Sequence, residues 1–316
     1  MAIARVVLQS AGMHEPILHH YDASPYAEKI RLAFGCKGLA WRSVEAPMVM
    51  PKPDLVELTG GYRRVPVLQI GADVYCDTHC IARVLDRVAP DPPLAPPAIE
   101  TEVHAVSRWA ETTFMMAVLA LFGIGGVFPP AMVEDRRKTM VPPGLDLDRT
   151  STILPTKLVQ IRANLDRLER ALADGRPFVF GAEPTLADLS AFHPLLLLLA
   201  HERTSAVLAP LRHVPAWAER VRAIGHGTRR ELAAADAIAI ARHADPAPFA
   251  GEPVVPDGMQ LGDPVVVLAD EYGSGVVAGR LAPSDLHEIA VRRETPRAGE
   301  VVVHFPREEY AVVAAG

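Results

Sequence analysis

The strongest pattern in the chain lies in residues 16–34, where a short apolar run is followed at once by helical spacing. The run begins at Ile17 and ends at polar Asp22, which is typical of a buried strand. Ser24 and Pro25 then mark a helix start, because a serine oxygen accepts hydrogen bonds from the first turn and proline lacks a donor that is not needed there. We therefore predict a strand that leads a hydroxyl group to an electropositive helix N-terminus.

Strands and helices are predicted to alternate as far as residue 88. Two prolines precede a short helix, and a Gly-Ala-Asp turn joins two strands as a hairpin. The expected elements are a strand at 39–46, a helix from about Asp54 to Gly60, strands at Pro66–Ile70 and Val74–Cys76, and a helix at Asp77–Val88. This order indicates a compact mixed α/β sheet with helices on it, which we assign to a domain of residues 1–89.

A proline-dense stretch at residues 90–99 interrupts the pattern and is predicted to be a stiff interdomain linker. From residue 100 to residue 245 the apolar spacing is mostly helical, which predicts an all-α domain, with residues 128–154 irregular or holding one short helix. Thr185 and Asp188 form a capping box at the start of an apolar helix, the hydroxyl meeting a backbone N–H and the carboxylate reaching back to the cap. A cap explains both residues, so we assign them to stability and not to catalysis.

The composition changes again in residues 246–316, where valines alternate with polar residues between glycine- and proline-containing turns. Alternation of this kind predicts four or five short antiparallel strands. We expect a small all-β domain, with an SH3-like barrel as the architecture that fits. Because a unit of about sixty residues is marginally stable alone, we expect it to dock on the helical domain.

Composition and charge narrow the classes of function. The 316 residues are 49% hydrophobic and 22% charged, which is a globular profile, and the net charge of −6 includes no dense basic block to bind nucleic acid. The apolar stretches at 115–128 and 195–200 are too short or too interrupted by glycine to span a bilayer, and the N-terminal run is too short for a secretory signal. We expect a cytoplasmic protein without a membrane segment.

The three cysteines, Cys36, Cys76 and Cys80, follow neither a Cys-x-x-Cys pattern nor a metal-ligand spacing. In a reducing compartment they are expected to be small core residues rather than nucleophiles. No metal site is predicted.

Three segments occur in a recognisable order: "SPYAEKIR" at 24–31, "RRVPVL" at 63–68 and "DTHCIARVL" at 77–85. Together with the capping box about a hundred residues further on, they resemble the glutathione S-transferase superfamily. The resemblance implies a thioredoxin-like N-terminal domain followed by an all-α domain. That family does not normally carry a C-terminal β domain.

The resemblance also implies a glutathione site. In that family Pro66 would follow a cis peptide bond, leaving the backbone of Val65 free to pair with the cysteinyl part of glutathione as an added strand does. Asp77 and Thr78 stand where the family usually has Glu-Ser, and they keep a carboxylate and a hydroxyl at a helix N-terminus to hold the γ-glutamyl group. Both residues also suit helix caps, and the two roles can coexist.

The group that activates the glutathione thiol is expected to be a hydroxyl near the end of the first strand. Our choice is Ser24, which otherwise serves only as a helix cap. Tyr21 is the rival, because several classes of the family use a tyrosine in this loop, although it equally suits strand packing. The absence of cysteine at position 24 argues against thiol exchange, which needs a protein thiolate.

The activity implied is transfer of glutathione to a small electrophile by a homodimer in which each N-terminal domain meets the partner's helical domain. We expect Trp109, Thr112, Phe114 and Met116 to line the electrophile pocket. The alternative is a non-catalytic module of the same fold that binds apolar ligands or another protein, and the additional β domain favours it.

Overall fold

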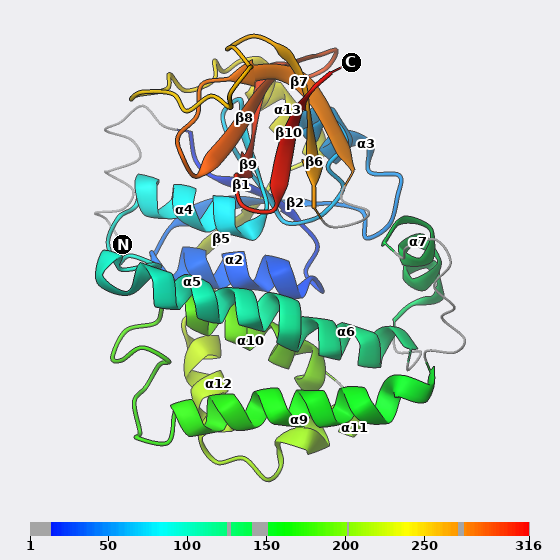
Figure 1. Ribbon diagram of the computed structural model, residues 1–316, viewed down its shortest axis with the longest axis vertical. Coiled ribbons are helices and arrows are strands. Elements are labelled where there is room, and N and C mark those ends of the chain that lie inside the picture. The colour runs from blue at the N-terminus through cyan, green and yellow to red at the C-terminus, as the bar shows by residue number, and fades with distance from the viewer. Residues whose placement is uncertain (1–13, 125–127, 141–150, 201, 271–274, 316) are drawn as a thin grey trace.

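The computed structural model describes residues 14–124, 128–140, 151–200, 202–270 and 275–315. The strands gather at one end of the molecule and the long helices at the other, with α2, α4 and α5 between them (Figure 1). Among the residues described, no helix is both long and apolar enough to cross a membrane. Residues 1–13, where we looked for a secretory signal, lie outside the described part.

The N-terminal unit has the expected order of strands and helices. Its elements are β1 (Ile17–His20), α2 (Pro25–Cys36), β2 (Ala40–Glu45), α3 (Pro53–Thr59), β3 (Val67–Ile70), β4 (Asp73–Cys76) and α4 (Thr78–Val88). β1 pairs in parallel with β2 and antiparallel with β3. β3 and β4 form the predicted hairpin, with Gly71 at φ 62° in its turn, a backbone angle that suits glycine. This mixed sheet confirms the thioredoxin-like domain.

The helical half follows a proline-containing connection. Its elements are η1 (Pro97–Ile99), α5 (Glu100–Arg108), η2 (Trp109–Phe114), α6 (Met115–Ile124), α7 (Pro130–Met140), η3 (Ser151–Ile153), α9 (Leu154–Ala171), α10 (Leu186–Leu199), α11 (Glu202–Ser205), η4 (Ala206–Leu208) and α12 (His213–Ala223). α10 lies at the centre and packs against α2, α5 and α12. Buried side chains of α2, α4 and these helices form one continuous hydrophobic cluster. The two halves therefore share a core.

Asp188 anchors the start of α10. The predicted capping box is present, and the Asp188 carboxylate accepts hydrogen bonds from the N–H of Thr185 at 3.0 Å, the N–H of Val179 at 2.8 Å and the indole of Trp217 at 2.9 Å. A fully buried carboxylate destabilises a fold unless it is hydrogen-bonded. These contacts support the assignment of Thr185 and Asp188 to stability.

The chain then returns to the sheet. β5 (Thr228–Glu231) pairs in parallel with β2, and α13 (Ala234–Arg242) packs against α3, β2 and β9. The end of the region that we expected to be helical, residues 100–245, thus lies against the thioredoxin-like domain.

The C-terminal extension consists of five strands: β6 (Pro264–Ala269), β7 (Val276–Ala282), β8 (Glu288–Thr295), β9 (Gly299–Pro306) and β10 (Tyr310–Ala314). They pair in the order β10-β6-β7-β8-β9, and β9 continues in parallel onto β4, so that the described strands form one ten-stranded sheet. The additional β region is confirmed, but the SH3-like barrel is not. We expected it to dock on the helical domain, and ion pairs do join it to α5, but its backbone joins the edge of the thioredoxin-like sheet.

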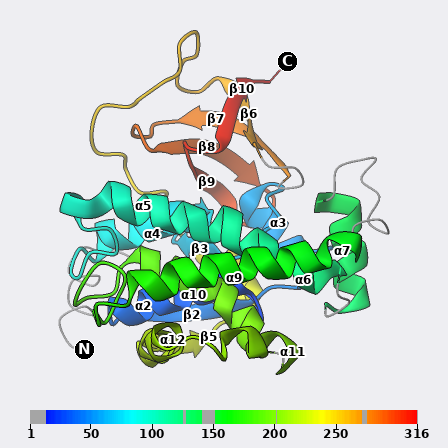
Figure 2. The same ribbon diagram turned by 60° about the horizontal axis from the view of Figure 1, so that its bottom comes forward.

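Two kinds of contact explain this docking. An edge strand presents unpaired N–H and C=O groups, and β9 satisfies those of β4. Behind the junction, side chains of both strands belong to one buried cluster that includes Val74, Cys76, Val301 and Val303. Figures 1 and 2 both place the extension above α4 and α5.

The junction also buries charged groups. His304 on β9 hydrogen-bonds through Nε2 to Asp73 Oδ1 on β4 at 3.0 Å, and through Nδ1 to Glu288 Oε1 on β8 at 2.5 Å. Burial alone would lower the pKa of His304, but the hydrogen bonds and charges of Asp73 and Glu288 raise it to about 9. The imidazole is therefore a buried cation between two carboxylates at neutral pH.

Candidate functional site

A cavity of about 930 Å³ opens between the thioredoxin-like domain, the α5–α6 region and the first residue of β10. All of the residues predicted to bind or activate glutathione line it: Tyr21, Ser24, Val65, Pro66, Asp77 and Thr78. They come from the loop after β1, the loop before β3 and the start of α4. The fold thus brings three separate segments to one site.

Ser24 is both the cap of α2 and a wall of the cavity. Its Oγ accepts a hydrogen bond from the N–H of Ala27 at 3.2 Å, and its own N–H donates to the carbonyl of Tyr21 at 3.0 Å. The residue is only 2% exposed. Because the cap uses a lone pair of the oxygen and not the proton, the hydroxyl can cap the helix and still donate to another acceptor.

Tyr21 follows β1 directly and is also buried. Burial raises the pKa of Tyr21, while the charge of Arg136 and hydrogen bonds with Arg136 and Ser24 oppose the rise. A raised pKa keeps the phenol protonated at neutral pH. The two candidate hydroxyls therefore lie side by side, and both can donate.

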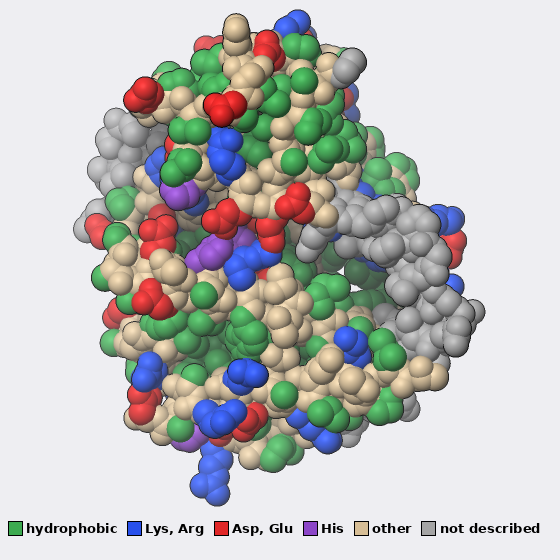
Figure 3. Space-filling view, in the orientation of Figure 1, with side chains coloured by type: hydrophobic (Ala, Val, Ile, Leu, Met, Phe, Trp, Pro, Cys, Tyr) green, Lys and Arg blue, Asp and Glu red, His purple; other side chains and the backbone are tan. Residues whose placement is uncertain are grey.

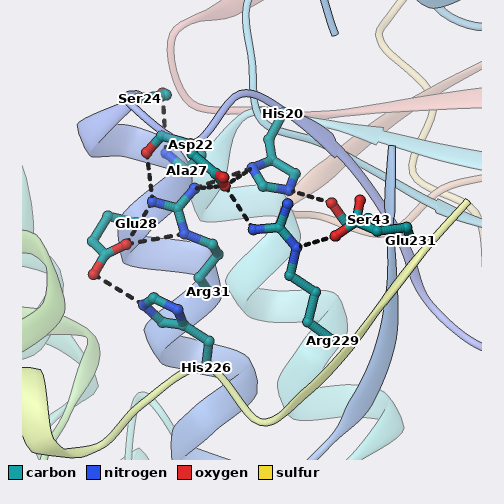
Figure 4. Close-up of polar contacts among 10 residues, drawn as sticks. All are labelled: His20, Asp22, Ser24, Ala27, Glu28, Arg31, Ser43, His226, Arg229 and Glu231. Atoms are coloured by element: carbon teal, nitrogen blue, oxygen red, sulfur yellow. Dashed lines mark hydrogen bonds and ion pairs between the residues drawn. The ribbon is translucent and has the colours of Figure 1, made fainter. Parts of the chain in front are cut away.

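Arg31 holds the loop that carries these hydroxyls. Its Nη2 donates to the carbonyl of Asp22 at 2.9 Å and to Glu28 Oε2 at 2.6 Å, and its Nη1 lies 3.0 Å from His20 Nδ1 (Figure 4). The guanidinium is almost completely buried. Planar, multidentate contacts of this kind fix orientation better than a lysine would.

The segment after α12 braces the same loop from the other side. His226 Nε2 lies 3.0 Å from Glu28 Oε1, and Arg229 Nη1 donates to Asp22 Oδ1 at 2.6 Å (Figure 4). Burial would raise the pKa of Glu28, but the hydrogen bonds and charges of His226 and Arg31 lower it. The return of the chain through β5 thus stiffens the loop that holds Ser24.

The backbone at Val65 is arranged for pairing. The peptide bond between Val65 and Pro66 is cis, as the resemblance implied. Neither backbone polar group of Val65 has a hydrogen-bond partner within the described residues. An extended peptide in the cavity can therefore pair with them.

Asp77 and Thr78 line the cavity at the start of α4. Asp77 caps α4, its Oδ1 accepting from the N–H of His79 at 2.9 Å, but its backbone has φ 75°, which is unfavourable for a residue with a side chain. A backbone outlier of this kind is typical of functional sites rather than of ordinary caps. Thr78, the first residue of α4, is buried at the cavity wall.

Sequence reasoning missed a basic cluster formed by Lys52, Arg63 and Arg136, all of which line the cavity. Arg63 Nη2 donates to Asp135 at 2.5 Å, and Arg136 also pairs with Asp135. Lys52 is 1% exposed, and its ammonium has no hydrogen bond or ion pair with any described residue. Burial, followed by the charges of Arg136 and Arg63, lowers the pKa of Lys52 to about 8. One carboxylate among three cations leaves room for an anion.

The pattern of residues along the sequence did not predict this basic cluster. Lys52 lies between two prolines in a loop, and Arg136 is more than eighty residues away on α7. A buried lysine is recognisable only when its surroundings are known.

Comparisons with known proteins agree with this geometry. Sequence profiles of the glutathione S-transferase N-terminal and C-terminal domains match residues 18–93 and 154–220. A GST-like protein from Pseudomonas syringae, known from its crystal structure, has 40% sequence identity with this chain. The two structures align with a TM-score of 0.77 over 95% of this chain and 100% of that one. This chain belongs to the glutathione S-transferase superfamily.

Two further proteins resemble this transferase-family chain at lower identity. Glutathione S-transferase U4 of Arabidopsis thaliana is 28% identical over 74 residues, so the match spans 23% of this chain and 33% of that relative. Glutathione transferase F2 of Populus trichocarpa is 17% identical, with a TM-score of 0.52 over 66% of this chain and 96% of its own, which shows the fold alone. At 95% coverage, the likeness to the Pseudomonas protein extends into the C-terminal strands.

The four residues that we expected to line the electrophile pocket of this superfamily member fall into two pairs. Thr112 and Met116 line the cavity, and Met116 is 54% exposed. Trp109 and Phe114 do not line it: the Trp109 indole donates to Asn164 at 2.9 Å, and Phe114 is fully buried in the helical core. Helical spacing alone did not separate the two faces. The apolar wall of the cavity is made by Met48, Leu119, Phe122, Phe128, Met132, Leu196, Leu197 and Leu199.

The cysteines of this transferase-family chain are unsuited to nucleophilic chemistry. Cys76 and Cys80 are buried, Cys36 is partly buried, and all three are free. Burial raises the pKa of Cys36 to about 12 and those of Cys76 and Cys80 well above the usual range. The described residues contain no group of three or more His, Cys, Asp or Glu side chains arranged to hold a metal ion.

Proposed function

We propose that this protein binds glutathione in the cavity and activates its thiol for attack on a small electrophile. The observation that carries the proposal is the convergence of Ser24, Val65, Asp77 and Thr78 on one cavity, although they lie on three separate segments. A scaffold without a ligand has no physical need for that convergence.

The cavity contains groups whose chemistry suits each of the three parts of glutathione. Asp77 and Thr78 suit the ammonium and carboxylate of the γ-glutamyl group, and the free backbone of Val65 suits the cysteinyl peptide unit. The glycine carboxylate would then extend toward Lys52 and Arg63, where cations outnumber carboxylates. A bound carboxylate would also favour the charged form of the Lys52 ammonium.

The thiol would lie near Ser24. A free thiol has a pKa of about 8.5, so only a few per cent is ionised at pH 7, and lowering that pKa by two units needs roughly 2.7 kcal/mol. One hydroxyl donor together with the N-terminus of α2 is of the right size to supply this. The electrophile would approach from the apolar wall, beside Met116.

A non-catalytic glutathione-binding module is the second candidate. One observation favours it: the Ser24 oxygen is already used as a helix cap and is almost inaccessible. Both candidates predict glutathione binding, but only the enzyme predicts a lowered thiol pKa.

Binding is tested by replacing the γ-glutamyl contacts. We expect Asp77→Ala combined with Thr78→Ala to weaken glutathione binding at least tenfold, or about 1.4 kcal/mol, in titration calorimetry. Asp77→Asn keeps an oxygen that can cap α4 but removes the charge, so it separates ligand loss from helix loss.

A matched control replaces the same residue types elsewhere. Thr156→Ala with Asp166→Ala lies on the exposed face of α9 and should leave the affinity unchanged. Equal affinities for the wild type and the Asp77 and Thr78 variants would refute the proposed site.

A further inference from the structure

The C-terminal extension forms part of the cavity wall. Glu309 and Tyr310, at the start of β10, line the cavity together with Ala269 at the end of β6. In Figure 3, acidic, basic and histidine side chains gather in the middle of the displayed face, where the strands of the extension meet the helices below. The extension therefore reaches the site as well as the edge of the sheet.

Tyr310 touches the carboxylate assigned to the γ-glutamyl group. Its hydroxyl lies 3.5 Å from Asp77 Oδ2, the oxygen that does not cap α4. The ring is buried and packs against Phe305, with ring centroids 5.2 Å apart. Tyr310 is thus held in place by the extension, with its hydroxyl at the limit of hydrogen-bond distance from Asp77 Oδ2 and also hydrogen-bonded with Tyr62.

Glu309 has an unusual and well-supported backbone. Its φ is 69°, in the left-handed region, and its carbonyl accepts a hydrogen bond from the N–H of Asp270 at 2.8 Å. Its side chain forms an ion pair with Arg108 at the end of α5. The turn before β10 therefore directs a carboxylate toward α5 at the edge of the cavity.

Arg108 has a second acidic neighbour, but that neighbour is already paired. Glu111 Oε2 lies 3.6 Å from Arg108 Nη1, whereas Lys29 Nζ and His79 Nε2 approach the same carboxylate at 2.5 Å and 2.7 Å. Arg108 is therefore available to Glu309 and to a ligand carboxylate. Three carboxylates, of Asp77, Glu111 and Glu309, line this part of the cavity with the Arg108 guanidinium, and that of Glu111 is already paired with Lys29 and His79.

We propose that Glu309 and Tyr310 complete the γ-glutamyl subsite, so that the extension selects peptides with a free α-ammonium group. Glu309 binds that ammonium together with Asp77, and Tyr310 is a positioning residue for Asp77. This inference rests on the proposed function. It assigns the five additional strands a role in ligand recognition.

Charge balance supports the assignment. A γ-glutamyl end carries one ammonium and one carboxylate, and desolvating an ammonium is unfavourable unless carboxylates surround it. Asp77 alone is partly committed to the cap of α4. Glu309 adds a second negative charge, while Thr78 and Arg108, which also pairs with Glu309, face the ligand carboxylate.

The extension is fixed firmly enough for this role. Arg83 on α4 donates to Asp285 at 2.8 Å, and His104 on α5 lies 3.1 Å from Glu308. These contacts are in addition to the pairing of β9 with β4. The subsite would otherwise depend on a mobile strand and would discriminate poorly.

The test compares two ligands, glutathione and its analogue in which hydrogen replaces the α-amino group. Calorimetry should show that the wild type prefers glutathione. Glu309→Gln should weaken glutathione binding about tenfold, leave the analogue's weaker affinity unchanged and so reduce the preference. Tyr310→Phe should reduce the preference by a smaller factor, because Asp77 keeps its charge.

Glu294→Gln is the matched control. Glu294 lies on β8 of the same extension, but it is exposed and does not line the cavity. It should bind both ligands as the wild type does. Equal thermal midpoints for the variants would establish that they are folded.

Each outcome decides the question. A preference that is unchanged in Glu309→Gln and Tyr310→Phe overturns this inference but leaves the proposed function intact. Equal weakening of both ligands also overturns it, since the ammonium is then not what Glu309 contacts. A wild type that does not bind glutathione at all refutes the proposed function on which the inference depends.

Discussion

At the scale of single residues, the site is defined by side chains with two roles. Ser24 caps α2 and lines the cavity, and Asp77 caps α4 while holding an unfavourable backbone angle. A structural role would explain each residue separately. The position of both on one cavity, with the free backbone of Val65 between the loops, is what a structural role does not explain.

At this scale, the question to test is which hydroxyl donates a hydrogen bond to the sulfur of bound glutathione. We predict that Ser24→Ala raises the pKa of the bound thiol, measured by thiolate absorbance, and slows conjugation of a generic electrophile about ten- to a hundredfold. Tyr21→Phe should be nearly silent, because Ser24 lies directly at the helix N-terminus and Tyr21 does not.

Ser24→Ala also removes a helix cap, so Thr185→Ala is its control. That variant loses the cap of α10 away from the cavity and should lower stability by about 1 kcal/mol without changing the thiol pKa. If Tyr21→Phe shows the rate loss and Ser24→Ala does not, Tyr21 is the donor. If neither variant changes a measurable activity, the non-catalytic module is the better description.

At the scale of elements, the most informative contact is the pairing of β9 with β4. It converts the exposed edge of a five-stranded sheet into the middle of a longer one. The same junction buries His304 between Asp73 and Glu288. Backbone hydrogen bonds and a buried ion cluster therefore both hold the extension to the sheet at this junction.

This cluster predicts a pH dependence. Because the pKa of His304 is raised from 6.5 to about 9, its contribution to stability is fully present below pH 6.5 and is lost as the pH rises through about 9. The maximum effect is on the order of 3 kcal/mol. We expect the free energy of unfolding, measured in urea, to fall between pH 7 and pH 9.5.

In the His304→Gln variant, the free energy of unfolding should change less between pH 7 and pH 9.5. The variant should also be less stable than the wild type at pH 7, because two buried carboxylates then lack their cation. His287→Gln is the control, because His287 is exposed on the same extension. An identical pH slope in the wild type and His304→Gln would show that the imidazole is not charged in the folded protein.

At the scale of the whole molecule, one sheet runs through the thioredoxin-like domain and the extension, and one hydrophobic cluster joins that domain to the helical half. The chain therefore consists of three sequence regions in continuous contact. Ion pairs with the extension already use parts of α4 and α5. A partner subunit must approach elsewhere on these elements.

We predict a homodimer, as membership of the superfamily suggests. Light scattering at micromolar concentration should give about 68 kDa, twice the chain mass of 34.1 kDa. A dilution series provides the control, because a reversible dimer loses mass on dilution while an aggregate does not follow a two-state curve. A mass near 34.1 kDa at every concentration would contradict the prediction, and the occupied faces of α4 and α5 would then account for it.

The sequence alone determined the local features of this protein. Ser-Pro at 24–25, the hairpin before residue 77 and the capping box at 185–188 were predictable because each depends on neighbouring residues, through caps, turns and periodicity. The family resemblance followed from the order of such segments. The residues that we propose for the glutathione site were named from that resemblance.

Only the tertiary structure decided which distant elements meet. The alternating valines of the extension predicted strands, but edge pairing depends on backbone groups that are the same in every sequence, so the partner β4 could not be predicted. Three other features likewise depend on contacts between residues more than fifty positions apart. They are the cluster of Lys52 with Arg136, the orientation of Trp109 toward the core, and the ion pair of Glu309 with Arg108. Periodicity specifies that a helix has two faces, whereas packing decides which face meets the cavity.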